Sequence, residues 1–198
     1  MFEDYDGENY DETPENDNNE SHDVKESYDL EEDYSNDKEE SHFDEIGNLK
    51  AETEYDVNGY HYETDEQGRI SCCSGVIKIE QAERNPSAQR EVGSEVRGKD
   101  ENGRALDDGG HLVASRFGGS GEKDNLVAMD RTLNRSDYRI MENEWAKLTK
   151  EGNTVDIEIY CRYKDNTNRP DKIDVFYTVT NKEGEEQPSV RRTFDNKM

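Results

Sequence analysis

The chain has 198 residues, with 50 acidic and 25 basic side chains, a formal net charge of −25 and only 29% hydrophobic residues. Taken whole, this charge argues against nucleic acid as a partner, because two polyanions repel each other. No apolar run approaches the ~18–20 residues of a membrane span, and the acidic N-terminus does not resemble a secretory signal, so we expect no membrane contact and either a cytoplasmic location or export independent of a signal peptide.

The charge is unevenly distributed along the chain. Residues 1–46 hold 20 acidic residues and 2 lysines, a net charge of −18, whereas residues 47–198 carry a net charge of −7. Few aliphatic residues occur before residue 47, so this segment cannot offset the entropy cost of ordering it. We therefore expect a disordered acidic tail over 1–46, with His22 and His42 solvated in it, and one folded domain over 47–198. The tail is either a solvating extension or a nucleic-acid mimic that competes for a groove on its own domain.

The first half of the folded part has the patterns of strands and loops. Tyr60, Tyr62 and Thr64 alternate with polar residues, and a turn at 65–68 follows. Further strands are expected at 69–71 and 76–79, so residues 55–80 are predicted to be β-structure. The glycine-punctuated, polar run 81–104 predicts a loop with at most a short helix, and further segments predict, in order, a short buried strand and a flexible turn: 112–114 and 117–121.

One helix and three further strands are predicted in the second half. Tyr138, Met141, Trp145 and Leu148 recur at helical spacing, which predicts a helix over 134–150. Its expected N-cap is Asn134 or Ser136, and Gly152 is expected to end it. Alternating patterns predict strands at the end of the chain: 155–163, 173–179 and 190–194. The predicted fold is α+β, with an antiparallel sheet and one main helix.

The three cysteines do not form a metal or disulfide pattern. Cys72 and Cys73 are adjacent, Cys161 lies in a predicted strand, and no C-x-x-C pair occurs. Adjacent cysteines are poorly placed to link distant segments. We therefore expect reduced, structural thiols.

His111 is the histidine with the most distinctive surroundings, since His61 lies in an alternating strand and is expected at the surface. His111 follows Asp107, Asp108 and two glycines directly. Glycines let a ligand or backbone come close, and the acids can orient an imidazole ring. Two interpretations stay open: a functional histidine, or one that caps a strand after a glycine turn.

Arginines concentrate around this histidine. Eight of the thirteen arginines lie between residues 84 and 139, where there are only two lysines. The planar guanidinium favours bidentate phosphate binding, which suits a phosphodiester substrate. Because residues 80–139 also hold twelve acids, a solvated surface of mixed charge is the alternative, and any nucleic acid must bind in a local groove.

The segments DDGGHLVASRFGG and DNLVAMDRTLNRSDYRIMENEW resemble the DNA/RNA non-specific endonuclease family of the ββα-metal (His-Me finger) class. The most similar branch comprises the nuclease toxin domains of type VII secretion systems and other polymorphic toxins. The resemblance runs from about residue 55 to residue 194, in three elements that agree in order and spacing. It implies a ββα-metal nuclease core and leaves the acidic tail unmatched.

The resemblance also implies roles for particular residues. His111 corresponds to the general base, with Asp108 and Gly110 as the supporting positions of its motif. Asn134 corresponds to the ligand of a single Mg²⁺ ion, for which Mn²⁺ is the expected substitute. Glu142 corresponds to a catalytic glutamate that holds a metal-bound water. Eight residues of a regular helix advance ~800°, which would put Asn134 and Glu142 ~80° apart around the axis and favours a water-bridged role for Glu142.

The sequence departs from the family at Gly109, where many members carry an arginine that contacts the phosphate. Four other arginines are candidates for this contact: Arg84, Arg97, Arg116 and Arg135.

The expected activity is Mg²⁺-dependent hydrolysis of DNA, RNA or both with little sequence preference, in a toxin-type nuclease that has a cognate immunity protein. Two other functions stay open from the residues alone. One is an acidic immunity or inhibitor protein that mimics nucleic acid, for which the tail would be needed. The other is a nuclease scaffold that has lost activity and only binds nucleic acid.

Overall fold

The structure, a computed structural model, describes residues 41–197. The predictions for the acidic segment up to residue 40, including the one for His22, lie outside the described residues. The elements follow in chain order: β1 Glu54–Val57, β2 Tyr60–Thr64, β3 Ile70–Val76, α1 Pro86–Ser94, β4 Asp107–His111, the 3₁₀ turn η1 Lys123–Asn125, β5 Leu126–Asp130, α2 Arg131–Leu133, the π-helical turn η2 Asn134–Tyr138, α3 Arg139–Lys150, β6 Thr154–Arg162, β7 Lys172–Thr180 and β8 Val190–Asp195.

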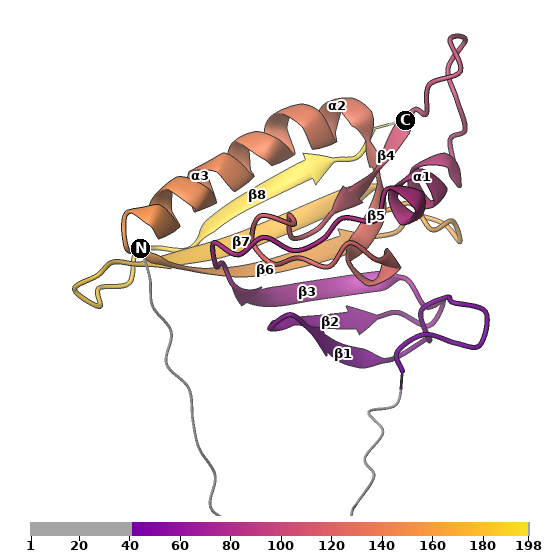
Figure 1. Cartoon of the computed structure of the whole chain (residues 1–198). Coiled ribbons are helices and arrows are strands. Elements are labelled where there is room, and N and C mark those ends of the chain that lie inside the picture. The colour runs from indigo at the N-terminus through magenta and orange to yellow at the C-terminus, as the bar shows by residue number, and fades with distance from the viewer. Residues whose placement is uncertain (1–40, 198) are drawn as a thin grey trace, which may run out of the picture. The chain divides into compact units, whose positions relative to one another are not determined.

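The main sheet is antiparallel and has six strands in the order β1-β2-β3-β6-β7-β8, while β4 and β5 form a separate antiparallel pair (Figure 1). The buried residues of β6 alternate strictly with exposed ones, so one face of the sheet is covered and the other meets solvent. Trp145 and Met141 of α3 share one core with Ile157 of β6 and Met129 of β5. The helix and the β4–β5 pair therefore cover the same face, and the predicted α+β fold is confirmed.

The alternating patterns correctly predicted most of the main sheet. Strands β2, β6, β7 and β8 lie where they were expected. His61 is partly exposed on β2, with its Nδ1 3.0 Å from the Asp56 carboxylate across the strand pair, as expected of a surface residue. All three cysteines are buried and free. Within residues 41–197, no helix combines the length and the apolar character that a membrane crossing requires.

The strand predicted at 112–114 is wrong, because the strand in this region is the preceding segment Asp107–His111. It pairs in register with β5, which was not predicted as a strand. The glycines of this polar segment permit a close approach to α1: a Cβ added to Gly109 would lie 2.4 Å from the carbonyl oxygen of Gln89. A side chain at position 109 would clash with the backbone of α1, so only glycine fits there.

A helix does occur in the run 81–104, as the nine-residue α1. Asn85 caps it, because its side-chain oxygen accepts from the backbone N–H groups of Ser87 and Ala88. Buried Ala88 and Val92 pack on β5 in a small second apolar cluster. This contact fixes α1 beside the β4–β5 pair.

The main helix starts earlier than predicted. The cap is Asp130, whose carboxylate accepts hydrogen bonds from the backbone N–H groups of Thr132 and Leu133, so Asn134 and Ser136 are not the N-cap. Helical structure then runs from residue 131 to 150 and includes the π-helical turn. Gly152, at φ +90°, follows the end of the helix as predicted.

Residues just before 47 belong to the folded part, so His42 is not a solvated bystander. Its ring stacks on Tyr55 at 4.3 Å between centroids, and its Nε2 lies 3.1 Å from the carboxylate of buried Asp124. Residues 43 and 49 form a β-bridge around a tight turn. The predicted boundary at 46/47 therefore falls inside this turn.

Candidate active site

A cavity of about 980 Å³ lies where α1, β4 and the start of the main helix meet. His111 of β4, Asn134 of η2 and Glu142 of α3 all line it. The structure thus brings together the three residues that the sequence proposed for chemistry, although 31 positions separate the first from the last.

His111 is the last residue of β4 and is 9% exposed. Burial, aided by the positive charge of Arg84, lowers the pKa of this imidazole to about 4. His111 is therefore neutral near pH 7 and able to accept a proton. Its Nε2 atom makes no hydrogen bond within the described part of the chain, so no structural partner there occupies this nitrogen.

The two acids that precede His111 do not orient it, contrary to one expectation from the sequence. Asp108 bonds instead to Asn134 and Arg135. Asp107 is fully buried and bonds to two arginines, one of which is Arg169. The two acids of the motif therefore bond to residues other than His111, and they fix the position of the strand that carries it.

Asn134 and Glu142 lie on adjoining parts of one helix face because of the π-helical turn between them. A π turn takes one residue more than an α turn, so eight residues here advance by about seven α-helical steps, or ~700°. The ~80° separation expected for a regular helix is therefore wrong, and both side chains line the cavity. Their axial separation stays near ~11 Å, which still favours a water-bridged role for Glu142.

Glu142 is a largely buried carboxyl. Burial raises its pKa to about 7, against the opposing charges of Arg116, Arg139 and Arg84. Its Oε2 lies 3.8 Å from Nη2 of Arg116, a distance too long for a hydrogen bond. Without a closer positive charge, the ionised form of Glu142 is unfavourable in this cavity.

We expect the variant Glu142→Gln to be more stable than the wild type at pH 8 in the absence of metal. The folded pKa of about 7 lies above the ordinary 4.5, so wild-type stability falls as pH rises from 4.5 through 7. The difference should be on the order of 2–3 kcal/mol at pH 8 and vanish near pH 4.5. Urea unfolding at both pH values measures it. The control Glu151→Gln removes an exposed carboxylate at the end of the same helix, and a Glu142→Gln effect as small as the control's would contradict the prediction.

The residues of the cavity fit a hydrated, hard divalent cation. Asn134 donates from Nδ2 to Asp108, at 2.9 Å, which leaves its carbonyl oxygen for a ligand. A cation beside Glu142 would also relieve the cost of that buried charge. Among residues 41–197, no three His, Cys, Asp or Glu side chains cluster as a metal site. An amide oxygen and one carboxylate suit an ion that keeps most of its waters.

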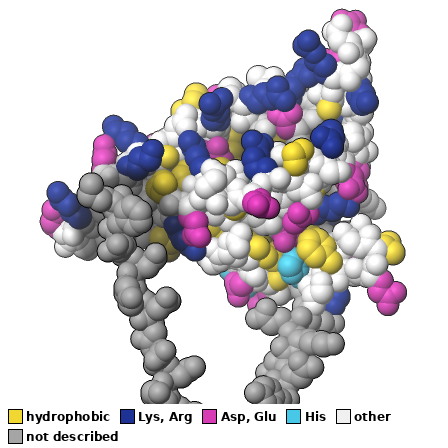
Figure 2. Space-filling model, viewed as in Figure 1, with side chains coloured by type: hydrophobic (Ala, Val, Ile, Leu, Met, Phe, Trp, Pro, Cys, Tyr) yellow, Lys and Arg dark blue, Asp and Glu magenta, His cyan; other side chains and the backbone are white. Residues whose placement is uncertain are grey.

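Six basic and three acidic side chains line the cavity, although the domain as a whole is acidic. In Figure 2, most of the basic side chains in view lie over the half of this face that carries α1 and α3 in Figure 1. The six basic residues are Arg84, Arg90, Lys99, Arg116, Arg135 and Arg139. The local basic groove that a nucleic-acid substrate requires is therefore present.

The four arginine candidates have different surroundings. Arg84 is exposed and lines the cavity. Arg116 also lines it and bonds to the Asn143 side chain at 2.8 Å. Arg135 lines it, but its guanidinium is bonded to Asp108. Arg97 does not line the cavity, because its Nη1 bonds to Asp107 and Asp130.

Arg139 is a cavity residue that the sequence argument passed over. It is exposed, and within residues 41–197 its guanidinium makes no hydrogen bond or ion pair. It lies one helical turn before Glu142, so the i, i+3 spacing was the available signal. The π turn also had a signal in the sequence that was missed. Buried Leu133 and Tyr138 are five residues apart, which is the spacing of a π-helical hydrogen bond.

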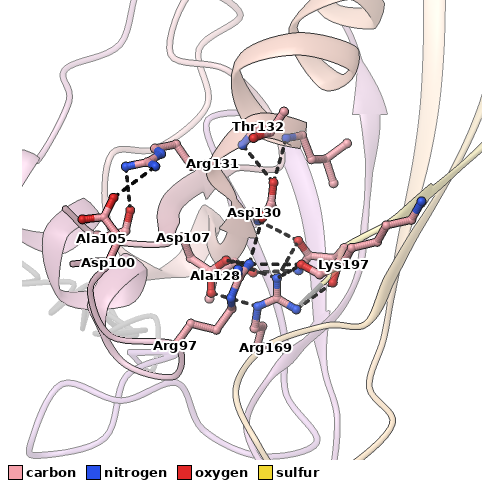
Figure 3. Close-up of polar contacts among 12 residues, drawn as sticks. Arg97, Asp100, Ala105, Asp107, Ala128, Asp130, Arg131, Thr132, Arg169 and Lys197 are labelled. Atoms are coloured by element: carbon pink, nitrogen blue, oxygen red, sulfur yellow. Dashed lines mark hydrogen bonds and ion pairs between the residues drawn. The ribbon is translucent and has the colours of Figure 1, made fainter. Parts of the chain in front are cut away.

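A buried ionic cluster anchors β4 at Asp107, at the opposite end of the strand from His111 (Figure 3). Arg169 donates to both carboxylate oxygens of Asp107, at 2.8 and 3.1 Å, and Arg97 adds a third bond at 3.0 Å. Arg169 also donates to the carbonyl oxygen of Asn196, whose amide group bonds to β5 at Ala128. The cluster links the strand of the histidine to the C-terminal segment.

The family model of the DNA/RNA non-specific endonucleases matches residues 51–181 of this chain. The chain belongs to this family. Type VII secretion system protein EssD of Staphylococcus aureus is 37% identical over 139 residues in strains USA300 and Newman, covering 66% of this chain and 22% of EssD. The chain thus spans about a fifth of the length of these curated relatives.

A solved structure has a similar fold. The structure of Sda1 nuclease with bound zinc ion aligns with a TM-score of 0.52 and 17% identity, covering 72% of this chain and 75% of that one. At this identity the likeness concerns the fold alone. Together with the family match, it confirms the predicted resemblance to the DNA/RNA non-specific endonucleases.

Proposed function

We propose that this domain hydrolyses phosphodiester bonds of DNA, RNA or both by using one hydrated Mg²⁺ ion, with His111 as the general base. The observation that carries the proposal is a buried, neutral histidine in a cavity shared with Asn134 and Glu142 and lined by basic residues. A neutral imidazole that is shielded from solvent is suited to take a proton from a water molecule attacking phosphorus.

Asn134 would be the direct protein ligand of the ion, and Glu142 would hold one of its waters. When bound, the ion supplies positive charge that stabilises the phosphate and the leaving oxygen. The guanidinium groups of Arg84 and Arg139 make no hydrogen bond or ion pair within the described residues, so they are available to bind phosphate. Arg116, whose guanidinium bonds to the Asn143 side chain, also lines the cavity and would support the same charge.

Contacts of this kind address the nucleic-acid backbone and carry little sequence information. Basic residues outnumber acidic ones in the cavity lining by six to three, which supports binding to the backbone and cleavage with little sequence preference. This lining also argues against the inhibitor alternative, because a nucleic-acid mimic presents acidic groups to its partner and has no use for a basic cavity.

We also propose a toxin-type role, with a cognate immunity protein and export that needs no signal peptide. The similarity to a protein of a type VII secretion system supports this role. The two-part organisation is likewise a proposal, with an acidic segment over about the first 40 residues followed by the nuclease domain.

The metal requirement is tested by cleavage of supercoiled plasmid and of a structured RNA. We expect no cleavage in a chelator, full cleavage when Mg²⁺ is restored, and partial or full cleavage with Mn²⁺, because both ions prefer oxygen ligands. Full activity in the chelator would contradict the metal mechanism. Activity restored by Zn²⁺ and not by Mg²⁺ would overturn the choice of ion and leave the nuclease assignment in place.

A further inference from the structure

Asp108 lies at the centre of a small network at the edge of the cavity. Its side chain is 19% exposed and accepts three hydrogen bonds from consecutive residues of η2. Nδ2 of Asn134 lies 2.9 Å from Oδ2, while Nε and Nη2 of Arg135 lie 2.8 and 2.7 Å from Oδ2 and Oδ1. One carboxylate therefore holds both an amide and a guanidinium.

The chemistry of this contact fixes which end of the Asn134 amide faces the cavity. An ionised carboxylate only accepts hydrogen bonds, whereas an amide has a donating NH₂ and an accepting oxygen. The NH₂ group of Asn134 must therefore face Asp108, since the flipped amide would place its oxygen against the carboxylate. The carbonyl oxygen is left for a cation.

Arg135 has a part in the same arrangement. Its side chain is 65% exposed, yet two of its donors bond to the two oxygens of Asp108. A bidentate guanidinium holds a carboxylate in one plane. With these donors engaged, Arg135 is less available to a phosphate than Arg84 or Arg139.

We propose that Asp108 is the positioning residue of the metal site, which presents the carbonyl oxygen of Asn134 to the ion, and that Arg135 clamps Asp108 instead of binding phosphate. The inference rests on the proposed function, because it concerns the ion that this function requires. Asp108 acts through Asn134 and touches neither the ion nor the substrate.

The test is direct binding of Mn²⁺, followed by the electron paramagnetic resonance signal of the free ion, on the full-length wild type and Asp108→Asn. An asparagine keeps the size of the side chain but no longer forces the Asn134 amide into one orientation. We expect the dissociation constant for Mn²⁺ to rise at least about tenfold, as is typical when a partner of a metal ligand is lost. The Mg²⁺ concentration for half-maximal cleavage should rise in parallel.

Two further variants separate positioning from other roles. Asp137→Asn makes the same change at an exposed residue of η2 that does not line the cavity and should leave Mn²⁺ binding unchanged. Arg135→Met removes the clamp but keeps the aliphatic bulk. We expect Arg135→Met to weaken Mn²⁺ binding at least about threefold and to change the KM for a short duplex less than twofold.

The outcomes are distinct. If the Asp108→Asn variant binds Mn²⁺ as tightly as the wild type and needs the same Mg²⁺ concentration for cleavage, the positioning role is overturned. The proposed function would still stand. If the Arg135→Met variant has a higher KM but binds Mn²⁺ like the wild type, the proposed role of Arg135 in holding Asp108 is overturned. Arg135 would then be a phosphate ligand. A wild type that binds no Mn²⁺ and cleaves fully in a chelator would overturn both the inference and the metal mechanism on which it rests.

Discussion

Replacing His111 by alanine should lower the rate of plasmid cleavage by about 10²–10⁴-fold, which is the contribution typical of a positioned general base. The structure supports a large effect because the imidazole is buried in the cavity, and burial together with the charge of Arg84 lowers its pKa to about 4. The base is then neutral throughout the range from pH 5 to 8. An ordinary histidine of pKa 6.5 would lose most of its neutral form by pH 5.

The measurement is the initial rate of nicking at saturating Mg²⁺, with circular dichroism to check that the variant is folded. His61→Ala is a matched control, because it removes a partly exposed histidine from the main sheet outside the cavity. It should cleave like the wild type. A folded His111→Ala variant that retains more than about a tenth of the wild-type rate would fall outside the expected range and contradict the role of the base.

The second large effect concerns stability. Asp107→Asn should lower the free energy of unfolding by about 3–5 kcal/mol, because it leaves a buried arginine without its counter-charge. The side chains of Asp107 and Arg169 are 0% and 4% exposed, and Asp107 is held by two arginines. The loss should loosen β4 from the C-terminal segment, since Arg169 bonds to both.

Urea unfolding at pH 7 measures this effect. Asp195→Asn is the control, because its carboxylate is 56% exposed and lies 3.8 Å from Lys172, so it should change stability by less than about 1 kcal/mol. A loss for Asp107→Asn no larger than that of the control would show that the cluster does not hold the fold together.

The sequence predicted the main sheet and the helix because their signals are local. Strict alternation marks β6, and residues at 3- and 4-residue spacing mark α3. The strand β4 was missed because its residues are polar or glycine and none has a strong β-propensity. The position of β4 depends on partners that are distant in the sequence. Arg169, which bonds to Asp107, lies 62 positions away, and the backbone of α1 packs against Gly109.

The same distinction applies to the site. His111, Asn134 and Glu142 were found through local motifs and their resemblance to a family, and the structure gathers them in one cavity. The roles of the arginines could not be predicted from the sequence, because they depend on long-range pairing. Arg97 pairs with Asp130, 33 positions away, and Arg135 pairs with Asp108, 27 positions away.

The net charge of the chain leads to a different conclusion when the N-terminal segment and the domain are considered separately. A net −25 argues against nucleic acid as a partner, yet most of that charge belongs to residues 1–46. The domain presents six basic side chains around its cavity. The local field at the site, and not the global charge, decides which ligand can bind there.

Chemical rescue of the His111→Ala variant by imidazole tests the central claim most directly. Truncation of this side chain leaves space beside the attacking water, which a small free base can fill. We predict that imidazole restores plasmid cleavage in proportion to the concentration of its neutral form, and that it does not raise the rate of the wild type. A folded variant that still binds Mn²⁺ but shows no dependence on imidazole would contradict the assignment of His111 as the general base.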